Sequence, residues 1–349
     1  MRTDVPKGPR FLLVLLGAGL YSATLAGPSE QERSVEYCNP IINRYLADPF
    51  ILTAGGKYYL FATGKAKDGR FIQIYCSDDL ARWEFVRGAV AKGKKGTWNR
   101  KNFWAPEVME INGRFHLYYT ASTEDTPKNT GNRVGLAVSD RPDGPYEDVG
   151  VVIPDASLDG SPFRDADGTL YMYYTIEHGS HAGLKAGRIY VDRMASPERV
   201  EGKPSLVLGK YHWQEGACMV HRHGKYYLTF STGGWRTANY HVRCAMGRSA
   251  TGPFAEQKDR LLQATDDVKG PGHHALFRDA AGHDWIVYHG WDPEFKARYP
   301  RIDPLLIMPG GMTTIGPTST PQTIGPGCWQ AANRRMQPTM VPEEPDPDR

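Results

Sequence analysis

Short apolar and aromatic runs recur along the chain, and glycine turns separate them. Five runs look alike: each begins at a glycine and continues into a segment rich in Tyr, Phe, Leu and Val, the composition of a β-strand. The leading glycines are Gly56, Gly113, Gly168, Gly224 and Gly282, so successive copies lie 57, 55, 56 and 58 residues apart. Sequence repeats of about 40–50 residues are typical of four-stranded propeller blades. The pattern predicts an all-β fold, a five-bladed β-propeller.

A second apolar strand precedes each copy, as at 50–52 and 219–220, and completes a hairpin. Apolar side chains fall on both faces of these strands, which is expected when a sheet packs between two neighbouring sheets. Outer strands also recur, at 135–139 and 245–249, and a Gly-Pro turn follows each of them. No stretch of three or more turns has a helical apolar period, so we expect little helix.

The composition is that of a soluble, turn-rich globular protein. Of the 349 residues, 40% are hydrophobic and 23% are charged, and the 38 Gly and 26 Pro indicate many turns. The formal net charge is only +3, from 42 basic and 39 acidic residues without a long basic run. This balance argues against nucleic-acid binding.

The N-terminal segment has the three parts of a secretory signal. Basic residues between positions 2 and 10 precede the apolar run 11–20, and small residues follow up to Ala26. The apolar run is short for a membrane span. Residues 1–26 are therefore predicted to be a signal peptide, and the mature protein to be secreted or periplasmic without membrane contact. An uncleaved N-terminal anchor is the alternative.

The repeats place one propeller domain at residues 36–330. The tail 331–349 is rich in proline and charge and lacks apolar residues that could pack, so it is predicted to be disordered.

The chain has five cysteines, an odd number, so at least one is free or pairs with another chain. Cys38 and Cys328 lie near the two ends of the domain, where a disulfide would help to close the ring. A buried free thiol is the alternative for each cysteine.

The same position in each repeat carries the candidate chemistry. Trp104, Asp159, Glu215 and His273 stand nine residues before the leading glycine of their repeats, and Asp48 stands eight before its own. Because the first strand of every propeller blade lines the central axis, we expect these side chains to meet at one mouth of the channel. Gathered carboxylates repel one another and are costly to desolvate, so their presence in phase predicts a functional site. Individually exposed turn residues are the alternative.

Three carboxyl groups and an aromatic ring suit glycoside hydrolysis. One carboxylic acid protonates the leaving oxygen, while another carboxylate activates water or attacks the anomeric carbon. A third carboxylate nearby can raise the pKa of the acid by charge repulsion.

At these residues the sequence resembles glycoside hydrolase family 43, the five-bladed propeller arabinanases, arabinofuranosidases and β-xylosidases. The resemblance spans about 38–322, and five short motifs carry it in order: Ala47-Asp48-Pro49, Trp104-Ala105-Pro106-Glu107, Leu158-Asp159-Gly160-Ser161-Pro162-Phe163, Glu215-Gly216-Ala217 and Gly270-Pro271-Gly272-His273-His274. It implies that Asp48 is the general base, Glu215 the general acid and Asp159 the pKa modulator of an inverting reaction.

The resemblance also implies residues that contact the sugar or a metal. Candidate substrate contacts are Trp104, Phe103, Ser161, Trp235 and Arg301, with Arg298 as an alternative to the last. His273 corresponds to the family's metal-site histidine, which implies a calcium ion; a neutral histidine in a hydrogen-bond network is the alternative. No organic cofactor is expected.

The leading functional prediction is hydrolysis of α-L-arabinofuranosyl linkages in arabinan or arabinose-decorated polysaccharides by a monomeric enzyme. A β-xylosidase or an exo-β-galactosidase would use the same carboxylates. A non-catalytic carbohydrate-binding propeller would need aromatic platforms but no acid and base. A phosphorylase would need a basic cluster at the pocket, which the repeat positions do not supply.

Overall fold

The structure is a computed structural model that describes Met1 and residues 35–127 and 130–325. The rest of the predicted signal peptide, the predicted tail 331–349 and Cys328 lie outside the described residues. Within the described part every regular element is a β-strand, so the prediction of little helix holds there. That part contains no helix of the length and apolarity that a membrane span requires.

Five sheets of consecutive strands make up the fold, as the repeat predicts. Blade 1 contains β2 (Ala47–Ala54), β3 (Lys57–Lys65), β4 (Phe71–Ser77) and β5 (Glu84–Val90). Blade 2 contains β6 (Lys101–Ile111), β7 (Arg114–Ser122), β8 (Arg133–Ser139) and β9 (Glu147–Val151). Blade 3 contains β10 (Ser157–Arg164), β11 (Leu170–Ile176), β12 (Ile189–Ser196), β13 (Arg199–Val200) and β14 (Ser205–Leu208). Blade 4 contains β15 (Gln214–Arg222), β16 (Lys225–Thr232), β17 (His241–Gly247) and β18 (Phe254–Glu256). Blade 5 contains β19 (Lys269–Arg278), β20 (Asp284–Trp291), β21 (Arg298–Met308) and β22 (Gly311–Thr314).

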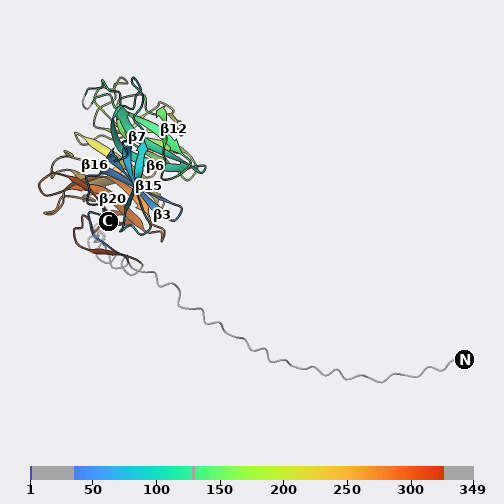
Figure 1. The fold of residues 1–349 in the computed structure, drawn as a ribbon, viewed down its shortest axis with the longest axis vertical. Coiled ribbons are helices and arrows are strands. Elements are labelled where there is room, and N and C mark those ends of the chain that lie inside the picture. Colours follow the sequence, from blue (N-terminus) through green and yellow to red (C-terminus); the bar gives the residue numbers. More distant parts are fainter. Residues whose placement is uncertain (2–34, 128–129, 326–349) are drawn as a thin grey trace, which may run out of the picture. The chain divides into compact units, whose positions relative to one another are not determined.

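The first strands of the five blades contact one another in a closed ring. β2 contacts β6, β6 contacts β10, β10 contacts β15, β15 contacts β19, and β19 returns to β2. Figure 1 shows the strands β3, β6, β7, β15, β16 and β20 converging on the centre of the domain. The predicted five-bladed β-propeller is confirmed.

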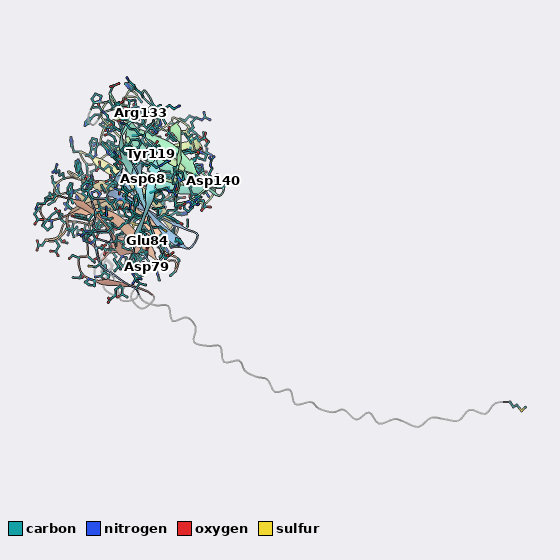
Figure 2. All side chains as sticks on the ribbon, in the orientation of Figure 1. Asp68, Asp79, Glu84, Tyr119, Arg133 and Asp140 are labelled. Atoms are coloured by element: carbon teal, nitrogen blue, oxygen red, sulfur yellow. The ribbon has the colours of Figure 1, made fainter. Side chains whose placement is uncertain are left out.

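Side chains crowd the ribbon throughout the domain (Figure 2), and apolar ones pack between neighbouring blades. Five buried clusters are present, and each one joins two adjacent blades. Trp285, for example, is 1% exposed and packs in the cluster between blades 5 and 1. Strands with apolar residues on both faces thus have both faces covered, as expected.

Strand pairing near the two ends of the described domain adds a sixth, small sheet. β1 (Val35–Tyr37) pairs antiparallel with β23 (Gln322–Ile324), with Val35 opposite Ile324. Cys38, next to β1, is an exposed free thiol. The N- and C-terminal ends of the described propeller are therefore joined by backbone hydrogen bonds.

A β-bulge interrupts the first strand of every blade at the level of the axis. In each case, pairing with the second strand stops at one residue and resumes three residues later, as between Glu215 and Cys218. The first bulge residue has a positive φ, which forces the backbone through a left-handed turn. These residues are Asp48 (51°), Ala105 (47°), Asp159 (58°), Gly216 (56°) and His273 (43°).

The bulges correct the equivalence that the glycine spacing predicts. Glu215 and Trp104 stand one residue before the bulge, whereas Asp48, Asp159 and His273 stand in it. Counting from the glycines misses this difference because the hairpin turns of blades 3 and 5 are longer than those of blades 1, 2 and 4.

Each bulge is tied to the blade before it by a hydrogen bond. The second strand of that blade supplies a side-chain acceptor for the bulge N–H in four of the five junctions. The pairs are Ala105 N to Thr63 Oγ1 (2.8 Å), Asp159 N to Thr120 Oγ1 (3.0 Å), His273 N to Ser231 Oγ (2.8 Å) and Asp48 N to His289 Nδ1 (3.2 Å). At the junction of blades 3 and 4 the acceptor is instead the carboxylate of Asp159, 3.3 Å from Gly216 N.

Replacing one of these acceptors tests their contribution to stability. Thr120 is fully buried, so Thr120→Val leaves the Asp159 N–H buried without its acceptor while keeping the side-chain shape. We expect the free energy of unfolding, measured by urea titration, to fall by about 1–3 kcal/mol.

Thr313→Val is the matched control, because Thr313 is half-buried on β22 and its hydroxyl makes no hydrogen bond within the described residues. It should change the free energy of unfolding by no more than about 0.5 kcal/mol. Equal free energies of unfolding for the two variants would contradict a stabilising role of the hydrogen bond between Asp159 and Thr120.

Candidate active site

A residue at or directly before the bulge of every blade lines one cavity of about 1090 Å³. Among the residues predicted for the site, those that line it are Asp48, Trp104, Asp159, Glu215, Trp235, His273 and Arg298. The three carboxylates and the histidine therefore come together, from blades 1, 3, 4 and 5. A pocket of this size is large enough for more than one sugar unit.

Asp48 is surrounded by hydrogen-bond donors and positive charge. Its Oδ2 accepts a hydrogen bond from Thr63 Oγ1 at 2.7 Å, and its Oδ1 lies 3.2 Å from Arg298 Nη1. Burial alone would raise the pKa of Asp48, but His273 and Arg298 outweigh it and hold the pKa well below its usual range. Asp48 is therefore ionised throughout the neutral and mildly acidic range, as a base must be.

Asp159 has the opposite electrostatic surroundings. It is 7% exposed, and burial raises its pKa above the ordinary value. His273 opposes that shift, while the carboxylates of Glu215 and Asp48 add to it. Two carboxyls at equivalent bulges are thus driven apart in pKa by the groups around them.

His273 stands between the two aspartates. Its Nδ1 lies 3.6 Å from Asp48 Oδ1 and 3.9 Å from Asp159 Oδ2. Burial would lower the pKa of His273, but Asp48, Asp159 and Glu215 raise it above its ordinary value. The carboxylates thus favour the protonated imidazole, whose positive charge would offset their mutual repulsion.

Glu215 is held through both of its carboxyl oxygens. Tyr240 donates its hydroxyl to Oε1 at 2.7 Å, and Trp213 donates Nε1–H to Oε2 at 2.6 Å. The main chain on the other side is fixed by the hydrogen bond from Gly216 to Asp159. The carboxyl group is consequently fixed in one orientation at the cavity wall.

Phe103 does not line the cavity, which corrects its prediction as a substrate contact. It is 3% exposed and belongs to the apolar cluster between blades 1 and 2, where its ring stacks on Phe71 at 4.1 Å between centroids. Trp104, the next residue, lines the cavity because successive side chains of a strand point to opposite faces.

Ser161 and Arg301 are also absent from the cavity lining. Ser161 is 2% exposed and its side chain hydrogen-bonds Glu107. Arg301 is 5% exposed and donates to the carbonyl of Thr318 at 3.1 Å. Of the two candidate arginines, Arg298, the predicted alternative, lines the cavity and stands at the start of β21.

Trp235 brings an exposed aromatic ring to the cavity lining. Trp235 is 46% exposed and stacks on Trp291 with 5.8 Å between ring centroids. The Arg298 guanidinium lies over both rings, with its Cζ 4.8 Å from the centroid of Trp235 and 5.4 Å from that of Trp291. The Trp235 indole is thus both exposed and held in place by its neighbours, so it offers a flat apolar face to a sugar ring.

Sequence reasoning missed Trp213, Tyr240 and His289. No repeat position marks Trp213 and Tyr240, which lie outside the strands. His289 does hold a repeat position, seven residues after its leading glycine, where the other blades carry Thr63, Thr120, Thr175 and Ser231. Burial lowers the pKa of His289 to about 4, so its neutral Nδ1 can accept the Asp48 N–H.

No group of three or more His, Cys, Asp or Glu side chains in the described part of the chain is arranged to hold a metal ion. His273 offers one nitrogen, whereas calcium takes 6–8 oxygen ligands in its usual sites. Protein side chains alone therefore do not fit a calcium site here, and no catalytic step is assigned to a metal. The calcium ion stays a prediction.

Comparison with known proteins decides the family. The sequence profile described as glycosyl hydrolases family 43 matches residues 37–313. The chain belongs to this family. It is therefore a glycoside hydrolase, and the resemblance inferred from the motifs is confirmed.

Relatives within the family have different activities. The chain is 28% identical over 271 residues to a beta-D-galactofuranosidase of Aspergillus niger, which covers 72% of this chain and 75% of that protein. It is 27% identical over 262 residues to an extracellular endo-alpha-(1->5)-L-arabinanase of Thermotoga petrophila, over 62% of this chain and about half (52%) of that relative. A crystal structure of a thermostable family-43 glycoside hydrolase matches with a TM-score of 0.73 at 27% identity, covering 82% of this chain and 98% of the other.

Removing the Arg298 charge tests the electrostatics of Asp48 in this family 43 enzyme. Arg298 lowers the pKa of Asp48, so Arg298→Gln should raise that pKa. A carboxyl group accepts a proton only when ionised, so the base role that the resemblance implies for Asp48 predicts that activity is lost at a higher pH as the solution is acidified. We expect the acidic limb of the kcat/KM profile to move to higher pH.

Arg301→Gln is the control, because Arg301 is buried away from the cavity. Its acidic limb should match that of the parent, whatever the change in overall rate or Tm. An unmoved limb in Arg298→Gln would contradict the effect assigned to the guanidinium.

Proposed function

We propose that this glycoside hydrolase cleaves α-L-arabinofuranosyl linkages of arabinan or arabinose-decorated plant polysaccharides by inversion. The proposal rests on two carboxyl groups, Asp48 and Glu215, that line the same cavity but have different neighbours. Asp48 is kept ionised by Arg298 and His273, whereas Glu215 is held by two neutral donors at the wall of the same cavity.

In this mechanism Asp48 removes a proton from a water molecule, which attacks the anomeric carbon. Glu215 gives its proton to the glycosidic oxygen as the bond to the leaving group breaks. Inversion requires room for that water, with the two carboxyl groups about 6.5–9.5 Å apart. Placement of the base on blade 1 and the acid on blade 4 supports such a gap.

Asp159 is proposed as the modulator of the acid. Its carboxylate accepts the Gly216 N–H and so fixes the backbone next to Glu215. It also lies near His273, which links it to the base. A change in the charge of Asp159 would therefore reach both catalytic carboxyls.

The furanoside preference is supported by relatives named as acting on five-membered sugar rings. An extracellular endo-alpha-(1->5)-L-arabinanase and an extracellular exo-alpha-(1->5)-L-arabinofuranosidase ArbA of Cellvibrio japonicus are both similar to this chain. The beta-D-galactofuranosidase supports a second candidate substrate, because a β-D-galactofuranoside has the same ring stereochemistry with one more exocyclic carbon. A xylosidase/arabinosidase of Humicola insolens, 25% identical to this chain, supports a β-xyloside as a third candidate substrate.

Secretion is proposed with this function. A polysaccharide cannot enter a cell intact, and several relatives are named extracellular. Cleavage of the predicted signal after Ala26 is tested by the N-terminal sequence of the exported protein.

The substrate proposal is tested with matched substrates. Linear arabinan, arabinoxylan and the aryl α-L-arabinofuranoside, β-D-galactofuranoside and β-D-xyloside are incubated with the enzyme, and products are separated by chromatography. We expect kcat/KM to be highest for the arabinofuranosyl substrates. Faster cleavage of the galactofuranoside or the xyloside would replace that assignment.

Glu215→Gln separates an enzyme from a carbohydrate-binding propeller. The amide keeps the size of the side chain, and it can accept from Trp213 and donate to Tyr240. It cannot protonate the leaving oxygen, so kcat should fall by about 10²–10⁴-fold on natural linkages. Oligosaccharide binding, measured by calorimetry, should persist. A parent protein that binds the polymer as well as the variant but turns over none of these substrates would be a lectin-like protein.

Inversion is read directly from the product. Proton NMR of the first minutes of hydrolysis should show the anomer opposite to that of the substrate, before mutarotation mixes the two. First appearance of the same anomer would mean a glycosyl-enzyme intermediate and would contradict the base role of Asp48.

A further inference from the structure

We propose that Tyr240 and Trp213 are positioning residues for the general acid, and that they fix the Glu215 carboxyl so that its proton faces the leaving oxygen. This inference rests on the acid role of Glu215 in the proposed function. It assigns roles to two side chains that no repeat position or family motif of the sequence identifies.

The two donors are chemically different. The Trp213 indole N–H can only donate, so Oε2 of Glu215 must accept at that contact, which is 2.6 Å long. The Tyr240 hydroxyl, 2.7 Å from Oε1, can donate or accept. In the neutral acid the carbonyl oxygen is the better acceptor, so the indole favours Oε2 as the carbonyl oxygen and the transferable proton on Oε1, while the Tyr240 hydroxyl donates to a remaining lone pair of Oε1.

Both hydrogen bonds become stronger as the reaction proceeds. When Glu215 gives its proton to the leaving oxygen, its carboxyl becomes a carboxylate, and a hydrogen bond to a charged acceptor is about twice as strong as one between neutral groups. Burial and the nearby Glu215 charge raise the pKa of Tyr240 well above its ordinary value, so the phenol stays protonated and donates. The pair thus stabilises the charge that appears in the transition state.

Tyr240 reaches Glu215 only because blade 5 carries a glycine at the critical place. The residue before the bulge is Gly272 in this blade, whereas other blades have a side chain there, as Glu215 in blade 4. A Cβ on Gly272 would overlap Tyr240 Cε1. The ring is fully buried in this gap and stacks on His289, with 5.9 Å between centroids and 11° between planes.

Trp213 lies on the loop between β14 and β15, and its position is also fixed by specific contacts. Its carbonyl accepts a hydrogen bond from Thr232 Oγ1 at 2.7 Å, which anchors the loop to blade 4. Gly187, with φ of 68°, lies against the ring: a Cβ there would be 2.7 Å from Trp213 Cε3. The indole is therefore packed on one side and lines the cavity, with only Glu215 as its hydrogen-bond acceptor among the described residues.

The leaving group provides the test. A 2,4-dinitrophenolate leaves without a proton, whereas a sugar alkoxide requires one, so only the second needs a well-placed acid. Tyr240→Phe removes the hydroxyl and keeps the ring. On the arabino-oligosaccharide its kcat should fall by about 10–100-fold, and on the 2,4-dinitrophenyl α-L-arabinofuranoside by less than about threefold.

Tyr227→Phe is the control, since Tyr227 is equally buried in blade 4 but donates to the carbonyl of Met308. It should lower the kcat for both substrates by the same small factor. Equal losses on both substrates in Tyr240→Phe, or no loss on either, would overturn the positioning role. Trp213→Phe is the second variant and decides the matter if Tyr240→Phe does not fold; it should show the same dependence on leaving group.

Failure of the proposed function looks different. If the parent enzyme cleaves neither arabinofuranoside, the substrate assignment is wrong. The two leaving groups are then compared on the glycosyl group that the parent does cleave. A parent that cleaves no glycoside with either leaving group overturns both proposals.

Discussion

The hydrogen bond between a bulge N–H and the blade before it is the interaction on which the site depends. A bulge turns the backbone of the first strand to the left at the axis, a conformation that costs roughly 1–3 kcal/mol for a residue other than glycine. Thr63, Thr120 and Ser231 supply acceptors that hold three of the bulges in that turn. The same contact joins each pair of blades, so the ring and the cavity are fixed together.

Equivalent backbone positions do not give equivalent chemistry, because each bulge faces a different neighbour. Asp48 and Asp159 share the left-handed turn, but Arg298 lies beside the first and Glu215 affects the second. The pKa of one falls and that of the other rises. A fivefold scaffold thus produces an asymmetric site through the side chains that differ between blades.

Two departures from the repeat complete the cavity. Glu215 stands one residue before its bulge, where its side chain meets the donors of Trp213 and Tyr240. Gly272 stands at the same place in the next blade and leaves room for the tyrosine ring. The acid and the gap beside it are therefore linked by the packing of blade 4 against blade 5.

The sequence by itself determined the architecture and the meeting of four polar residues. Strand composition and repeat length can be read along the chain, so they predicted the five blades. The repeat position of Asp48, Asp159, Glu215 and His273 predicted that these side chains meet at one end of the central channel. Only the tertiary structure decided which residue of a close pair reaches the cavity, as with Arg298 rather than Arg301. Such choices depend on turn length, on bulges and on contacts between blades. Trp213 and Tyr240 contact Glu215 from outside the repeated strands, where no pattern along the chain marks them.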